Sequence, residues 1–151
     1  MPGKDGQSQY ICGREAIDPL HAFFDEPWVQ SYMDGRMLSR ERFPRIVLQQ
    51  SHGDHVAKLP ADAVLLASST SCEVEMYTVR PGRLLAFQSH PEFNASFQQE
   101  MSSMESLQFG DMWDVLAGFK RSKFLAIQDT TKGPETRNLV LGIIMEFVHC
   151  R

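Results

Sequence analysis

An apolar run, Leu84–Phe87, stops abruptly at a polar segment that contains His90, Pro91 and Glu92. Such a run predicts a buried strand that leads into a turn at the edge of a sheet. Residues i and i+2 of an extended segment project to the same side, so we expect the His90 imidazole to contact the Glu92 carboxyl. Pro91 stiffens the turn between them. A histidine beside a carboxylate is two thirds of a nucleophile-activating triad, although a structural histidine beside a surface glutamate is the simpler alternative.

Four further segments have strand patterns. Ile46–His52 and Ala63–Ser69 are apolar runs typical of buried strands, and residues 10–17 form a weaker one. Residues 72–79 alternate as a strand with one wet face does, which predicts a half-exposed Cys72. A Pro-Gly turn separates this segment from residues 83–88, so the two are expected to pair as an antiparallel hairpin.

Helical patterns follow the strands. Residues 93–104 and 135–148 carry apolar side chains at helical spacing, with Asn94 as a plausible N-cap, and residues 112–124 suggest a further helix. Residues 21–38 are interpreted as a short helical turn or an irregular segment, and residues 1–9 as a loop. Strands first and helices afterwards favour one layered α/β or α+β domain.

Composition excludes several classes of protein. The chain has 151 residues, 42% of them hydrophobic, and a formal net charge of -4, which argues against a nucleic-acid or anionic-membrane partner. No run approaches the roughly 18 apolar residues of a membrane span, and the polar start lacks the apolar core of a secretory signal. Three scattered cysteines make a disulfide framework improbable, so we expect a cytosolic protein. His52, Asp54, His55 and Cys72 have no convincing ligand spacing, so neither a metal nor another cofactor is expected.

Three segments together resemble the class-I glutamine amidotransferase family: residues 50–60, 66–76 and 87–93. The most similar members are free-standing cytosolic amidotransferase-like proteins, including those related to the glutaminase domain of GMP synthase. The resemblance implies a mostly parallel sheet between helices, with a smaller antiparallel part. It also implies release of ammonia from glutamine through a cysteine thioester. His90 takes the role of proton shuttle, Glu92 orients it, and Ser51 and His52 lie beside the substrate pocket.

The chain departs from this family at the nucleophile. The family's cysteine lies on a sharp Gly-x-Cys-x-Gly turn, which the sequence lacks, and Cys12 has a glycine on one side only. Residues 13–17 resemble the segment that comes after that turn in relatives. We therefore expect an α/β fold: a partial three-layer sheet-and-helix domain, residues 1–110, without the N-terminal strands and the nucleophile elbow. Residues 111–151 are expected to form a divergent helical C-terminal segment. Cys12 is expected to be structural, and neither Cys72 nor Cys150 is expected to be a nucleophile.

Two functional hypotheses remain open. The first is an amidotransferase-like hydrolase domain for glutamine or a γ-glutamyl compound, inactive alone because it lacks the elbow. The second is a non-catalytic binding or regulatory pseudo-amidotransferase, or a truncated gene product. In either case an incomplete sheet would expose an edge and an apolar face, which a protein partner would be expected to cover.

Overall fold

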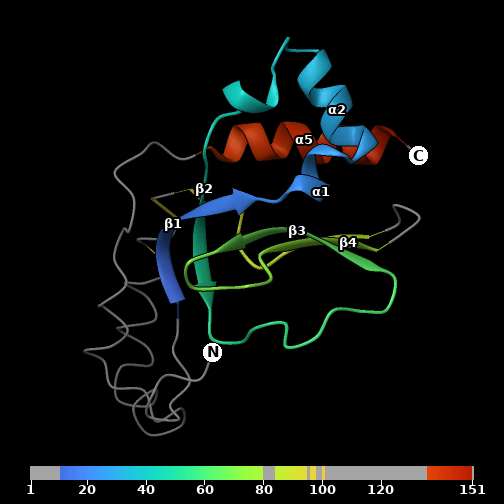
Figure 1. Ribbon diagram of the computed structural model, residues 1–151. Coiled ribbons are helices and arrows are strands. Elements are labelled where there is room, and N and C mark those ends of the chain that lie inside the picture. Colours follow the sequence, from blue (N-terminus) through green and yellow to red (C-terminus); the bar gives the residue numbers. More distant parts are fainter. Residues whose placement is uncertain (1–10, 80–83, 95, 98–99, 101–135, 151) are drawn as a thin grey trace, which may run out of the picture.

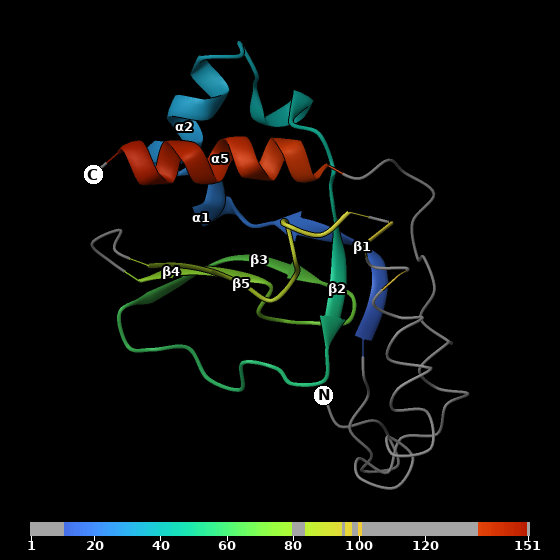
Figure 2. The same ribbon diagram turned by 180° about the vertical axis from the view of Figure 1, so that it is seen from behind.

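The computed structural model describes residues 11–79, 84–94, 96–97, 100 and 136–150. Within them, five strands form one sheet in the order β2-β1-β3-β4-β5. The α-helices of this part of the chain, α1, α2 and α5, gather on one side of the sheet (Figures 1 and 2). The strands are β1 (Ile11–Pro19), β2 (Ile46–His52), β3 (Ala63–Ser69), β4 (Met76–Val79) and β5 (Leu84–Phe87).

Strand β1 joins the two halves of the sheet. It pairs with β2 through residues 11–17 and with β3 through residues 17–19, so Ile17 lies opposite both Ile46 and Ser69. The predicted strands Ile46–His52 and Ala63–Ser69 are confirmed with the same bounds. The predicted hairpin is confirmed as the antiparallel β4–β5 pair.

The first half of the segment 72–79 is not a strand, and the prediction of a half-exposed Cys72 is wrong. Cys72 is only 3% exposed. The peptide N–H of Ser69 donates to the Cys72 carbonyl oxygen at 2.7 Å, and the Cys72 N–H donates to Ser69 Oγ at 3.0 Å. This tight turn folds Cys72 inward, where its thiol donates to the Val74 carbonyl oxygen at 3.3 Å. The ladder therefore begins only at Met76.

Every ladder among the described strands is antiparallel. The mostly parallel sheet that the family resemblance implies is therefore not seen in this part of the chain. For β3–β4 and β4–β5 the connections account for this, because the turns that join these strands are too short for a parallel crossover.

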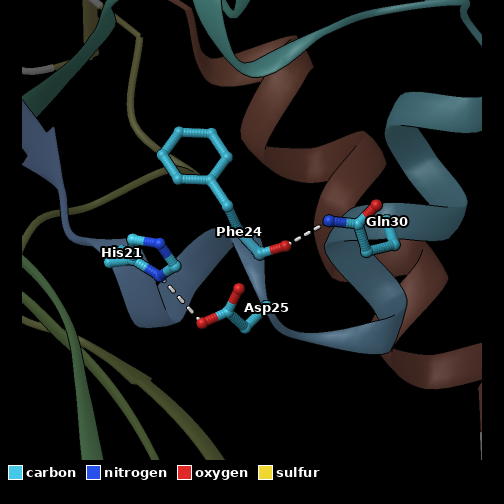
Figure 3. Close-up of polar contacts among 4 residues, drawn as sticks. All are labelled: His21, Phe24, Asp25 and Gln30. Carbon is cyan, nitrogen blue, oxygen red and sulfur yellow. Dashed lines mark hydrogen bonds and ion pairs between the residues drawn. The ribbon is translucent and has the colours of Figure 1, made fainter.

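The segment 21–38 is more regular than predicted. It contains a single helical turn, α1 (His21–Phe24), and a longer helix, α2 (Pro27–Asp34), followed by a 3-10 turn, η1 (Arg40–Arg42). Proline at the first turn of α2 needs no hydrogen bond there and already has a helical φ. Figure 3 shows the joint between the two helices: Gln30 Nε2 donates to the Phe24 carbonyl oxygen, and the His21 ring contacts Asp25 at 2.9 Å.

The predicted C-terminal helix is confirmed as α5 (Arg137–His149). It packs against α2 and buries three side chains at spacings of three and four residues: Val140, Ile143 and Phe147. They join a core that includes Phe23, Trp28, Ile46 and Leu66. None of the described helices is long and apolar enough to cross a bilayer.

The predicted cap at Asn94 is confirmed, because its Oδ1 accepts the Phe97 peptide N–H at 2.8 Å. The predicted helix 112–124, the loop 1–9 and most of the segment 93–104 lie outside the described residues. The proposed boundary between residues 110 and 111 falls there too and stays a prediction.

Replacing Ile143 with alanine tests the packing of α5. Its side chain is 1% exposed, so Ile143→Ala should lower the free energy of unfolding by about 3 kcal/mol through lost burial and a residual cavity. Met145, on the same helix, is 54% exposed, and Met145→Ala should change stability by less than about 0.5 kcal/mol. Chemical denaturation of both variants is the measurement. Equal losses would show that α5 does not pack as described.

Candidate active site

His90 is held on the edge of β2. It lies beyond the end of β5, and its peptide N–H donates to the Gln49 carbonyl oxygen at 2.8 Å, forming an isolated antiparallel bridge. The strand that feeds this segment ends at Phe87 because the chain then turns toward β2. The segment that carries His90 is thus fixed by a backbone bond to a strand that is distant in sequence.

The His90 ring is fixed from two directions. Nδ1 lies 2.7 Å from Glu92 Oε1, and the ring stacks on Phe93 with centroids 4.1 Å apart and planes 4° from parallel. The predicted contact between His90 and Glu92 is therefore confirmed. The His90 side chain remains 29% exposed and Glu92 is exposed. Since a carboxylate can only accept, Nδ1 carries the hydrogen, and Nε2 is the nitrogen suited to exchange a proton.

Ser51 and His52, the predicted pocket residues, project to opposite faces of β2 because they are neighbours on one strand. Ser51 is half-buried and His52 is buried. His52 Nδ1 lies 3.0 Å from the Asp54 carbonyl oxygen, and Nε2 lies 3.1 Å from the Gln50 side chain. Their contact with a substrate stays a prediction.

The pKa of His52 is lowered from its ordinary value of 6.5. Burial is the largest cause, and the neighbouring imidazoles of His55 and His90 lower it further. The hydrogen bond to the Asp54 carbonyl and the Asp54 charge act in the opposite direction without cancelling the effect of burial. His52 therefore resists protonation in the folded chain.

A buried polar group behind the site was not predicted. Glu75 is 1% exposed, and its Oε1 accepts from Gln50 Nε2 at 2.9 Å and from Ser69 Oγ at 2.7 Å. Burial, more than any other cause, raises the pKa of the Glu75 carboxyl. The alternating pattern of residues 72–76 does not separate Glu75 from the exposed Glu73. A better indication of a buried polar group was Gln50, a polar residue that continues the buried run of β2.

A second buried acid lies nearby on β1. Glu15 accepts from the Ser71 peptide N–H at 2.9 Å and also from the Ser71 hydroxyl. Its charge is one of the causes that raise the pKa of Glu75. These acids accept hydrogen bonds from Ser69 and Ser71 at the turn between β3 and β4.

Two thiols have described side chains, those of Cys72 and Cys150. Burial raises the pKa of the Cys72 thiol, which disfavours the reactive thiolate. Cys150 is exposed at the end of α5. Cys12 lies opposite Ser51 in the β1–β2 ladder, and its side chain lies outside the part of the chain that the structure describes. No group of three or more potential metal ligands occurs among the described residues.

Comparison with known sequences supports the family resemblance over a short segment. Over 43 residues the chain is 49% identical to gamma-glutamyl peptidase 4 of Arabidopsis thaliana, which is 28% of this chain and 17% of that protein. No protein-family model matches the chain.

Solved structures resemble the chain over nearly its whole length. A glutamine amidotransferase from Methylobacillus flagellatus matches with a TM-score of 0.53 and 19% identity, covering 95% of this chain and 52% of its own. A glutamine amidotransferase from Thermotoga maritima matches with a TM-score of 0.52 and 16% identity, covering 94% and 52%. The chain therefore has the glutamine amidotransferase-like fold, as predicted, and spans about half the length of these structures.

The lowered pKa of His52 makes stability depend on pH. Below pH 6.5 the unfolded chain binds a proton at residue 52 more readily than the folded chain does, so stability is lost as pH falls toward the folded pKa. We expect the wild type to lose thermal stability relative to His52→Gln between about pH 7.5 and pH 5.5. A replacement of the exposed His21 by glutamine is the control. Parallel pH profiles for wild type and His52→Gln would contradict the burial of a neutral His52.

The Glu92 contact should fix the tautomer of His90. In wild type, neutral His90 should carry its hydrogen on Nδ1, and Glu92→Ala should remove that preference because the acceptor is lost. Nitrogen NMR of the imidazole distinguishes the two tautomers, and replacement of the exposed Glu73 by alanine should leave the spectrum unchanged. An unaltered tautomer in Glu92→Ala would show that this carboxylate does not orient the ring.

Proposed function

We propose that the chain is an amidotransferase-like domain that supplies the base and its carboxylate partner for hydrolysis of a glutamine amide or a γ-glutamyl bond. The observation that carries this proposal is the 2.7 Å contact between His90 Nδ1 and Glu92 Oε1. It occurs on a fold that solved glutamine amidotransferases share. The local similarity to a gamma-glutamyl peptidase supports the wider substrate class, since both substrates present the same side-chain carbonyl.

In the proposed reaction a cysteine thiol passes its proton to His90 Nε2 and attacks the γ-carbonyl carbon. The tetrahedral intermediate then breaks its C–N bond as His90 returns the proton to the leaving nitrogen. Ammonia or an amine leaves, and water hydrolyses the remaining thioester to regenerate the thiol. Glu92 keeps the imidazole oriented and stabilises the imidazolium that forms in each step.

The thiol for this reaction is not identified in the chain. Its 151 residues contain no Gly-x-Cys-x-Gly turn, and Cys72 is buried with a raised pKa. We therefore propose that the chain alone does not form the thioester. The presence of the His90–Glu92 pair without that turn also favours a second candidate function, a binding or regulatory module that holds a γ-glutamyl compound without cleaving it.

We further propose that Ser51 and His52 lie beside the substrate and that the protein is cytosolic. We also propose that a protein partner covers the sheet. The outer edge of β2 is a poor place for such a partner. The backbone of Val47 already hydrogen-bonds to Thr136, and the carbonyl oxygen of Gln49 already accepts from His90. Strand β5, at the other end of the sheet, carries the exposed Leu84 and is the better place for a partner strand.

Incubation of the purified chain with glutamine and with a γ-glutamyl dipeptide tests both parts of the proposal. We expect no ammonia or amine release above that of His90→Ala, and no cysteine labelled by an electrophilic glutamine analogue. The γ-glutamyl dipeptide should nevertheless shift the NMR signals of the His90 ring, while the α-linked isomer should not.

Labelling of Cys12 or Cys72, with turnover, would contradict the absence of a nucleophile. Unchanged His90 signals at saturating dipeptide would contradict the site itself.

A further inference from the structure

We propose that Glu75 is a buried neutral carboxylic acid, joined to a neutral His52 by hydrogen bonds through the Gln50 side-chain amide, and that this relay positions the segment carrying His90. The relay is inferred from hydrogen-bond geometry. Its importance for His90 rests on the proposed function.

The side chains of Glu75, Gln50 and His52 form a continuous hydrogen-bonded row. Gln50, fully buried, lies between the other two, with Nε2 2.9 Å from Glu75 Oε1 and Oε1 3.1 Å from His52 Nε2. Ser69 Oγ donates to the same Glu75 oxygen at 2.7 Å. Glu75 Oε2 is buried without a hydrogen-bond partner among the residues that the structure describes.

The contacts of His52 decide which protons are present. Nδ1 faces the Asp54 carbonyl oxygen, an acceptor, so Nδ1 carries a hydrogen. If Nε2 faces the Gln50 amide oxygen, it must carry a hydrogen too, and His52 is a cation. The amide nitrogen then donates to a Glu75 carboxylate, which gives a buried charge at each end of the row.

An alternative uses the same number of protons. The two ends of an amide have the same shape, so their orientation is assigned from their partners. With the amide turned over, its nitrogen donates to the His52 Nε2 lone pair and its oxygen accepts a proton from Glu75. Glu75 and His52 are then both neutral. The contacts Glu75–Gln50, Gln50–His52 and His52–Asp54 each join a donor to an acceptor.

The surroundings favour the neutral arrangement. Glu75 faces the Glu15 carboxylate from β1, and His52 faces the imidazoles of His55 and His90, so like charges oppose ionisation at both ends. Asp54 favours a charged His52, and Ser69, Gln50 and the Ser89 backbone favour a charged Glu75. Burial outweighs them, raising the pKa of Glu75 and lowering that of His52.

The relay connects the two anchors of the His90 segment. The Gln88 peptide N–H donates to the Glu75 carbonyl oxygen at 2.8 Å, and the His90 N–H donates to Gln49 at 2.8 Å. The contact between Glu75 and Gln50 ties these anchors together across the sheet. Glu75 is therefore a positioning residue, because it acts on His90 through the backbone and touches no reacting atom.

Replacement of Glu75 by glutamine mimics the neutral acid and provides the test. In wild type near neutral pH, infrared spectroscopy should show the carbonyl band of a protonated carboxylic acid. That band should vanish in Glu75→Gln and persist in Glu15→Gln. Nitrogen NMR should show His52 neutral with its hydrogen on Nδ1, in wild type and in Glu75→Gln. Glu75→Ala should shift the His90 backbone signals, and Glu75→Gln should restore them.

The stability of the variants gives an independent readout. Because the pKa of Glu75 is raised above its unfolded value of 4.5, wild type should lose stability relative to Glu75→Gln as pH rises toward the folded pKa. An absent acid band, a His52 protonated on both nitrogens near neutral pH, or a Glu75→Gln chain that cannot fold would each overturn the proposal. None of these readouts uses a γ-glutamyl ligand, so they stand or fall separately from the proposed function.

Discussion

The hydrogen bond from the His90 peptide N–H to the Gln49 carbonyl oxygen determines whether the candidate site exists, because it attaches a turn to the edge of β2. The same edge binds the start of α5: Val47 donates to Thr136 Oγ1 at 2.7 Å, and its carbonyl oxygen accepts the Thr136 N–H at 3.0 Å. An edge strand usually leaves such groups to solvent or to another chain. Here β2 uses them to position both a helix and an imidazole.

Two glutamates near this edge show how environment decides the chemistry of one residue type. Glu92 is exposed, and its Oε1 lies 2.7 Å from Nδ1 of the His90 ring. Glu75 is buried beside another acid, and its pKa is raised. We propose that the exposed Glu92 orients the His90 ring and that the buried Glu75 fixes the backbone segment that carries His90. A buried polar row and the exposed Glu92 are therefore both proposed to position the same residue, His90.

Local patterns predicted the parts of this structure that depend on neighbours in sequence. The bounds of β2 and β3, the β4–β5 hairpin and the helix α5 with its buried Ile143 and Phe147 all arise from periodicity and turn residues. The contact between His90 and Glu92 spans two residues and was equally accessible. The burial of Glu75 was not, because it depends on Gln50, which lies 25 residues before Glu75. The inward turn of Cys72 depends on Ser69, only three residues away, but the alternating pattern of residues 72–79 was interpreted as one strand. Glu73 and Glu75 look alike in the sequence, and only long-range packing distinguishes them.

A crystal structure of the chain with a bound γ-glutamyl dipeptide tests the central claim most directly. The account predicts the γ-carbonyl group beside His90 Nε2, with Nδ1 still bonded to Glu92 and the His90 N–H still bonded to Gln49. A dipeptide bound away from this edge of β2, or an imidazole turned away from Glu92 in the complex, would contradict it.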